Sequence, residues 1–136
     1  DLQSVARQPV FTEDSRGGGE EWMNAFVNYW NGPGSWESMP EPNRQAFLRV
    51  GRKVYYEVKS LSADRTPLNV YHKLTMPVLL VHGERTPASA RRVLELLAPV
   101  IPHARLVSLP GAGHMGPLTH AAAFQQLVET QLAEAR

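Results

Sequence analysis

The chain has 136 residues, of which 43% are hydrophobic and 20% are charged, and its formal net charge is +1. This composition is typical of a folded globular domain and excludes a disordered or low-complexity chain. The balance of acidic and basic residues argues against nucleic-acid binding, and no apolar run approaches the ~18 residues that span a bilayer. The absence of cysteine excludes disulfides and thiol nucleophiles and is compatible with a reducing, cytoplasmic compartment.

The first part of the chain opens with an irregular lead-in over residues 1–19 and continues with a helix over 20–30. The lead-in ends in a run of three glycines at 17–19. We interpret this run as a flexible entry loop, because a phosphate-binding loop needs a preceding strand and usually a lysine. Acidic residues occupy the first turn of the helix, where the helix dipole favours them. Its apolar side chains recur at helical spacing at Trp22, Met23, Phe26, Val27 and Trp30.

A short turn and a longer helix complete the helical region, which we place at 20–66. The turn spans 35–40 and holds Trp36 and Met39. Pro42 suits the first turn of the helix, which is predicted to run to about residue 61. The apolar stripe of this helix is expected to face a core, and its members are Phe47, Val50, Val54, Val58 and Leu61.

Residues 67–136 are predicted to form a β-α-β-α region. The continuous apolar run over 77–82 is typical of a strand that is buried on both faces of a parallel sheet. A helix over 89–100, a strand over 106–109 and a helix over 120–134 follow. The side chains that these helices are expected to bury are Val93, Leu94, Leu97, Val100, Phe124, Leu127, Val128 and Leu132. Two parallel strands do not make a stable sheet, so we expect the sheet to continue in polypeptide outside this sequence.

Two loops are expected at the carboxyl ends of these strands, where open parallel sheets bind ligands. They are residues 83–87 and 111–117. Small residues on both sides of His114 leave its imidazole unobstructed, as a general base requires. A surface histidine with no chemical role is an equally good interpretation on physical grounds alone.

The stretch 74–132 resembles the C-terminal half of enzymes with the α/β-hydrolase fold. The segment MPVLLVHGE at 76–84 is similar to the penultimate strand of that family and its glycine, and LPGAGH at 109–114 is similar to the final strand and the catalytic histidine. The segment FVNYWNG at 26–32 is similar to the helical cap that such enzymes insert. The resemblance implies an α/β fold: the C-terminal part of an α/β-hydrolase parallel sheet, preceded by a helical cap.

The same resemblance implies that His114 is the histidine of a Ser-acid-His triad, but it leaves the acid open. Thr86 occupies the usual acid position, three residues after the glycine, and cannot carry the charge. Glu84 could reach the histidine from a neighbouring position, the acid could follow the preceding strand near Asp1, or there is no acid. The plainer role for Glu84 is that of a solvated loop residue or a partner of Arg85.

The remaining expectations concern the nucleophile, the substrate and metals. The nucleophile motif G-x-S-x-G occurs nowhere in the 136 residues. The resemblance therefore implies a nucleophile and an oxyanion hole upstream of this chain, which alone would be inactive. Side chains that could line an apolar substrate pocket, or simply pack, are Trp30, Trp36, Met115 and Leu118. No cofactor is implied, and the other histidines, which show no zinc-ligand spacing, are His72, His82, His103 and His120.

We therefore expect the C-terminal portion of a cytoplasmic, serine-nucleophile hydrolase that supplies the catalytic histidine. Its substrate would be a small, largely apolar molecule such as an ester, and neither nucleic acid nor a membrane would be a partner. The alternative is a non-catalytic fragment or interaction module. Such a module would complete its sheet with the missing N-terminal half of a hydrolase core, with another partner or with a second copy.

Overall fold

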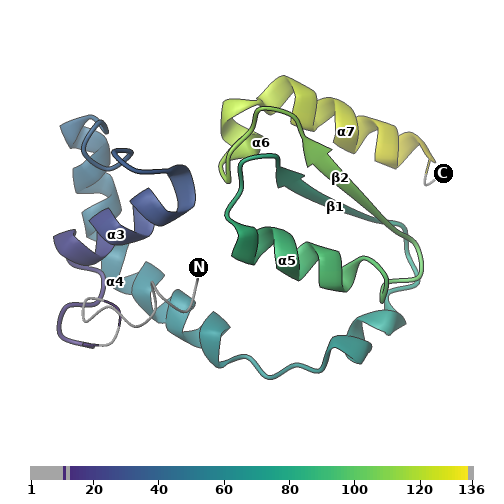
Figure 1. Cartoon of the computed structure of the whole chain (residues 1–136), viewed down its shortest axis with the longest axis horizontal. Helices are drawn as coiled ribbons and strands as arrows, with labels where there is room; N and C mark the ends of the chain where they lie inside the picture. The colour runs from purple at the N-terminus through teal and green to yellow at the C-terminus, as the bar shows by residue number, and fades with distance from the viewer. Residues whose placement is uncertain (1–10, 12, 135–136) are drawn as a thin grey trace. The chain divides into compact units, whose positions relative to one another are not determined.

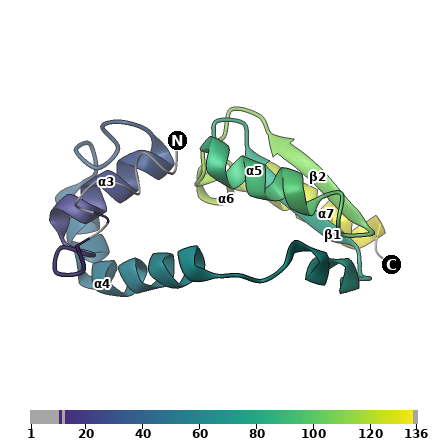
Figure 2. The same ribbon diagram turned by 60° about the horizontal axis from the view of Figure 1, so that its bottom comes forward.

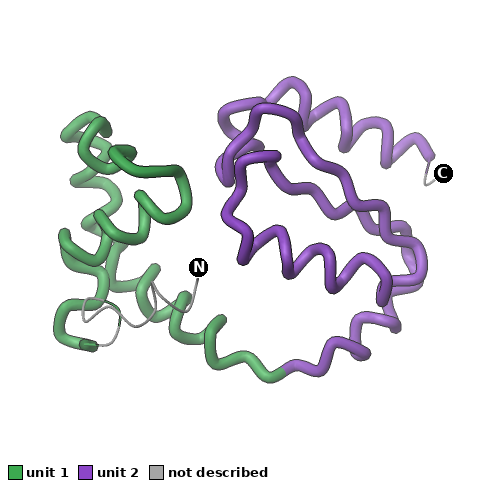
Figure 3. Tube along the Cα trace, in the orientation of Figure 1, with its two compact units in different colours: residues 1–65 green, residues 66–136 purple. Residues whose placement is uncertain are grey.

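The computed structural model (Figure 1) describes residue 11 and residues 13–134, which belong to two compact units. Unit 1 comprises residues 1–65 and unit 2 comprises residues 66–136, as coloured in Figure 3. The border between the units lies one residue before the border predicted from the sequence.

Unit 1 contains two helices, α3 (Glu20–Asn31) and α4 (Glu41–Ala63). Both begin and end close to the positions that the sequence predicts. Helix α3 ends at Gly32, whose φ of 101° is a left-handed conformation that glycine adopts without strain. Helix α4 has a proline in its first turn, where the missing N–H leaves no hydrogen bond unmade.

The core of unit 1 is aromatic. Its buried members are Trp22, Met23, Val27, Trp36 and Tyr55. The ring of Trp22 stacks on Phe26 at a centroid distance of 4.9 Å and meets Tyr55 edge-to-face at 5.7 Å. Such pairs add about 0.5–1.5 kcal/mol each beyond the area they bury. The spacing of apolar residues in α3 thus marks the buried face of that helix.

The glycine run at 17–19 packs against α4, so the prediction of a flexible entry loop is wrong. Gly17 and Gly18 are buried. A Cβ atom on Gly51, in the middle of α4, would lie 2.1 Å from the carbonyl oxygen of Gly18. The two backbones approach so closely that neither residue has room for a side chain.

This contact also explains why the predicted apolar stripe of α4 is only partly buried. The structure buries Gly51 and Tyr55, whereas Val50 is 46% exposed and Leu61 is 76% exposed. The hydroxyl of Tyr55 donates a hydrogen bond to the carboxylate of Asp14. The glycine contact and this hydrogen bond turn α4 so that the neighbouring face is buried, and apolar spacing alone carries no information about either.

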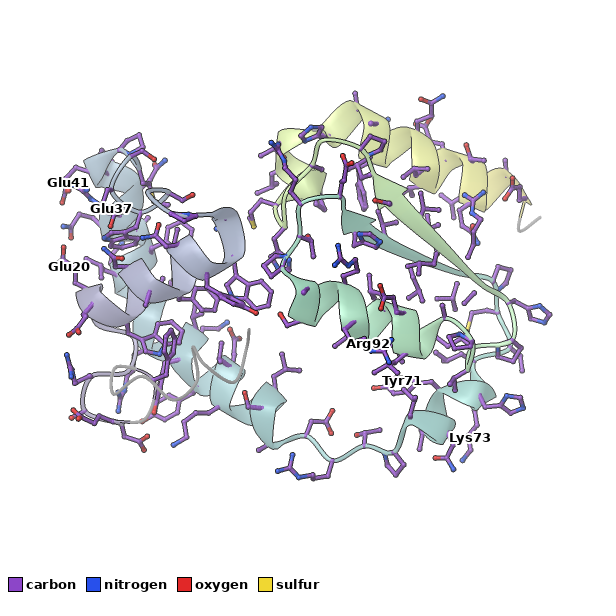
Figure 4. All side chains as sticks on the ribbon, viewed as in Figure 1. Glu20, Glu37, Glu41, Tyr71, Lys73 and Arg92 are labelled. Carbon is purple, nitrogen blue, oxygen red and sulfur yellow. The ribbon has the colours of Figure 1, made fainter. Side chains whose placement is uncertain are left out.

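Side-chain hydrogen bonds hold the predicted turn at 35–40 on α3. The carboxylate of Glu37, labelled in Figure 4, accepts hydrogen bonds from Asn24 at 2.9 Å and from Asn28 at 3.1 Å. The backbone N–H of Glu37, and then the amides of Asn28 and Asn24, lower the pKa of this carboxyl group. Asn28 Oδ1 in turn accepts a hydrogen bond from the backbone N–H of Trp36 at 2.9 Å. The turn is therefore fixed where the indole of Trp36 enters the core.

Unit 2 is mixed α/β, which confirms the predicted class. Its elements are η1 (Leu68–Lys73), β1 (Val78–Gly83), α5 (Ala88–Leu97), β2 (Ala104–Leu109), α6 (Gly116–Thr119) and α7 (Ala121–Glu134). The two strands pair in parallel, with Val78 opposite Ala104 and Gly83 opposite Leu109. Helix α5 lies on one face of this sheet and α7 on the other (Figures 1 and 2). The short helices η1 and α6 were not predicted from the sequence.

Burial in unit 2 is lighter than the sequence predicts. Most of β1 is half-buried rather than buried on both faces. Val93 is 54% exposed and Leu132 is 61% exposed, although both were expected to be covered. The described sheet has two strands, so one helix on each face cannot cover all of its apolar residues.

An open apolar groove of about 400 Å³ runs between β1 and α7. It is lined by Leu79, Val81, Pro117, Phe124, Val128, Gln131 and Leu132. Leu79 and Val81 are two positions apart in the strand, so their side chains point to the same face of the sheet. None of the described helices combines the length and the apolar character that crossing a bilayer requires.

Candidate functional site

The loops that follow β1 and β2 meet at one edge of the sheet, as the sequence predicts. The two strands end level, because Gly83 is opposite Leu109. Beyond the ladder, the N–H of Glu84 donates to the carbonyl of Leu109 at 3.0 Å, and the N–H of Arg85 donates to the carbonyl of Ala112 at 2.9 Å. Backbone hydrogen bonds thus continue from the strands into the loops.

Gly83 allows this close approach. A Cβ atom on Gly83 would lie 2.1 Å from the carbonyl oxygen of Gly113 and 2.5 Å from that of Ala112. Both neighbours are backbone atoms and cannot rotate away as a flexible side chain would. The glycine that ends the predicted strand is therefore required by the packing of one loop on the other.

A tight turn leads from β2 towards His114. The N–H of Ala112 donates to the carbonyl of Leu109 at 3.3 Å, which closes a four-residue turn. Pro110 and Gly111 occupy its central positions, and Gly111 has a φ of 67°. Proline followed by a glycine with positive φ is the arrangement of a type II turn. Such a turn makes no internal use of the N–H and C=O groups of Gly111.

Two neighbouring charged side chains bind those groups. The carboxylate oxygen Oε2 of Glu84 accepts a hydrogen bond from the N–H of Gly111 at 2.7 Å. The guanidinium of Arg85 donates through Nη2 to the carbonyl of Gly111. We name this arrangement, of Glu84 and Arg85 with the two backbone groups of Gly111, the Gly111 clamp.

His114 lies three residues after Gly111. Its side chain is exposed, yet partial burial lowers the pKa of its imidazole below the ordinary value. Helix α6 begins two residues later, at Gly116, whose N–H donates to the carbonyl of Gly113 at 3.1 Å. A lowered pKa favours the neutral imidazole, which is the form that accepts a proton.

The acid candidates lie in different settings. Glu84 contacts the histidine loop through the backbone of Gly111. Thr86, at the position where an acid was expected from the sequence, is 7% exposed, and its N–H donates to the carbonyl of Gly83 at 3.0 Å. Thr86 thus belongs to the turn after β1. Asp1 lies outside the described residues.

The substrate-binding candidates divide between the units. In unit 2, Met115 directly follows His114 and Leu118 lies in α6, and both side chains are exposed. In unit 1, Trp36 is 3% exposed and belongs to the core. Trp30 is half-buried and meets Tyr29 edge-to-face at 4.9 Å. Of the four candidates, Met115 and Leu118 are the ones close in sequence to His114.

The remaining titratable groups do not converge on a metal site. Within the part of the chain that the structure describes, no three or more histidine, aspartate or glutamate side chains are grouped as metal ligands. The ring of His82 lies with its Nδ1 3.0 Å from the carbonyl oxygen of Gly83. Its place at the end of β1 supports a packing role.

Arg85 and Gly111 are the site residues that the sequence alone did not identify. The Pro-Gly pair at 110–111 indicates a turn and a glycine with positive φ. No comparable signal links Arg85 to Gly111, because that contact joins residues 26 apart in the chain. Comparison of the chain with protein-family models, curated proteins and solved structures gives no match.

Proposed function

We propose that this chain is the C-terminal portion of an α/β-fold hydrolase, in which His114 is the general base. One observation carries this proposal. The loops after two parallel strands are hydrogen-bonded into one surface, which presents an exposed imidazole with a lowered pKa at the carboxyl edge of the sheet. A histidine in this position, neutral at working pH, can accept a proton from a neighbouring nucleophile.

The proposed chemistry is acyl transfer to water. His114 accepts the proton of a serine hydroxyl as the serine oxygen attacks the substrate carbonyl, and then gives that proton to the leaving group. Water then attacks the acyl-serine as His114 takes its proton, and that proton passes to the serine oxygen as the acid is released. The serine and the oxyanion hole would be supplied by polypeptide outside this sequence, which contains no G-x-S-x-G motif. The exposed apolar side chains of Met115 and Leu118 favour a small, largely apolar substrate.

A chromogenic-ester assay tests this proposal on the protein extended through the reading frame upstream of Asp1. His114→Ala is expected to lower kcat/KM by about 10²–10⁴-fold, the usual contribution of a general base. His103→Ala is the matched control, because His103 is exposed and contributes a backbone carbonyl to Val78 at the opposite end of β1. Undiminished turnover in the His114 variant would refute the proposed role.

A second candidate function is a non-catalytic module that completes its sheet with another polypeptide. Two observations favour it: an uncharged, buried Thr86 stands at the position of the family's acid, and the described part of β1 pairs with β2 alone. The groove beside β1 leaves further apolar surface exposed. Size-exclusion chromatography with light scattering is expected to show self-association, and a compact monomer at all concentrations would contradict this candidate.

Location and partners are part of the same proposal. The absence of cysteine suits the reducing conditions of the cytoplasm. The proposed partners are a small-molecule substrate and the polypeptide that supplies the other strands.

A further inference from the structure

We propose that Arg85 is a positioning residue for His114 and acts through the backbone of Gly111. The guanidinium holds the C=O of Gly111 while the carboxylate of Glu84 holds its N–H. The catalytic meaning of this inference rests on the proposed function. Its structural content concerns only the loop after β2.

The inference follows from which peptide planes the clamp fixes. The N–H of Gly111 belongs to the peptide plane that precedes its Cα, and the C=O belongs to the plane that follows it. Holding both planes fixes φ and ψ of Gly111 together. Glycine needs this restraint more than any other residue, because it has the largest backbone freedom to lose.

Arg85 extends the restraint towards His114. Its own backbone N–H donates to the carbonyl of Ala112 at 2.9 Å. The side chain and main chain of one residue therefore bind two successive carbonyl groups of the histidine loop. Two residues beyond Ala112 the chain reaches His114, so the direction of the loop is set before the imidazole.

The clamp is also balanced in charge. Glu84 and Arg85 carry opposite charges and bind groups of opposite polarity, because a carboxylate accepts from an N–H and a guanidinium donates to a C=O. Hydrogen bonds to charged groups are stronger than those between neutral groups. The ring of His120 is a further titratable group near the turn, because its Nε2 lies 3.7 Å from the position that a Cβ on Gly111 would occupy.

This arrangement gives Glu84 a different role from that of a triad acid. Its described contact is with the backbone that carries the histidine. Arg85 acts on the same peptide unit from the other side. The orientation of His114 then depends on two side chains from the loop after β1.

NMR on the 136-residue chain tests the inference through Arg85→Ala and Arg85→Lys. In Arg85→Ala, the amide of Gly111 is expected to exchange with solvent at least ~10-fold faster, because the turn opens more often. The titration midpoint of His114 is expected to rise towards the ordinary histidine value as the imidazole becomes better solvated. High salt screens the effect of the lost charge, so the rise should persist there. Arg85→Lys keeps a hydrogen-bond donor at this position. Both the faster exchange of Gly111 and the rise of the His114 midpoint should therefore be smaller in this variant than in Arg85→Ala.

Arg92→Ala is the matched control, since Arg92 is an exposed arginine of α5, labelled in Figure 4, that pairs with Glu95. It should leave the exchange of Gly111 and the titration of His114 unchanged. Equal effects in both variants would overturn the inference. So would a lower Tm in Arg85→Ala with an unchanged His114 titration, because a merely structural role predicts that result.

The experiments distinguish a failure of this inference from a failure of the proposed function. The NMR experiment needs no activity and depends only on the loop. If Arg85→Ala shifts the titration of His114 but His114→Ala leaves ester turnover intact in the extended protein, the positioning role stands and the hydrolase proposal falls.

Discussion

At the residue scale, two glycines of the same pair of loops face different surroundings. Gly83 lies against backbone oxygens of the opposite loop, whereas a Cβ on Gly113 would meet no atom within 4 Å. We expect Gly83→Ala to destabilise unit 2 by about 2–3 kcal/mol, because backbone atoms must move to admit the methyl group. Gly113→Ala should change stability by less than about 1 kcal/mol. Thermal unfolding followed by circular dichroism compares the two, and equal losses would contradict the packing described.

The pKa of His114 predicts a pH dependence of stability. Burial lowers its pKa in the folded chain, so the unfolded chain binds more protons in the window below the ordinary value of about 6.5. Stability from this group is therefore full above that value and falls as the pH drops through the folded pKa. His114→Gln should flatten the pH profile of Tm in this window. A steeper profile in the variant would mean that the shift has the opposite sign.

At the element scale, helix α4 depends on a glycine that helix propensity disfavours. Alanine at position 51 would gain about 0.5–1 kcal/mol of helix propensity. Its Cβ would nevertheless lie 2.1 Å from the backbone oxygen of Gly18. We expect Gly51→Ala to lower the free energy of unfolding of unit 1 by about 2 kcal/mol or more.

Tryptophan fluorescence measures the unfolding of unit 1 in the Gly51→Ala chain without a contribution from unit 2. All three tryptophans of the chain, at positions 22, 30 and 36, belong to unit 1. Ser60→Ala, at an exposed position of the same helix, is the control and should be neutral or slightly stabilising. A stabilised Gly51→Ala chain would show that α4 can move away from the glycine run.

The elements also show what periodicity can and cannot predict. The bounds of α3, α4 and β1 follow from apolar spacing and from proline and glycine signals, which are local properties of the chain. The buried face of α4 does not follow, because Gly18 and Asp14 set it from a distant segment. The position of His114 follows from its glycine-rich loop. The contact of Arg85 with Gly111 does not, since it joins two loops that only the folded sheet brings together.

At the scale of the whole molecule, the two units bury their apolar residues unequally. Unit 1 has a core that includes two buried tryptophans, whereas the buried apolar side chains in the described part of unit 2 are Ile101, Leu109 and Ala112. The sequence indicates from its two strands that the sheet needs neighbouring strands, but its apolar spacing predicts more burial in β1, α5 and α7 than the structure shows. The sequence does not predict the location of the exposed apolar surface. The structure places part of that surface in the groove between β1 and α7.

The groove should bind a dye that fluoresces on apolar surfaces, such as anilinonaphthalene sulfonate. Val81→Thr places a hydroxyl in the groove at nearly constant volume and is expected to lower the dye signal about two-fold or more. Val93→Thr changes an exposed valine of α5, outside the groove lining, and is the control. Equal loss in the two variants would place the dye elsewhere.

The register of the two strands has a consequence for how this region can vary in length. Ladder hydrogen bonds at both ends, from Val78 to the carbonyl of His103 and from Glu84 to that of Leu109, fix β1 against β2. An extra residue inside either strand would offset the loops and reverse the faces of all side chains beyond it. The link between α5 and β2 lies outside this ladder, so insertions there leave the register intact. Natural variation in length should therefore collect between residues 98 and 102, and be excluded from the strands that align the loops.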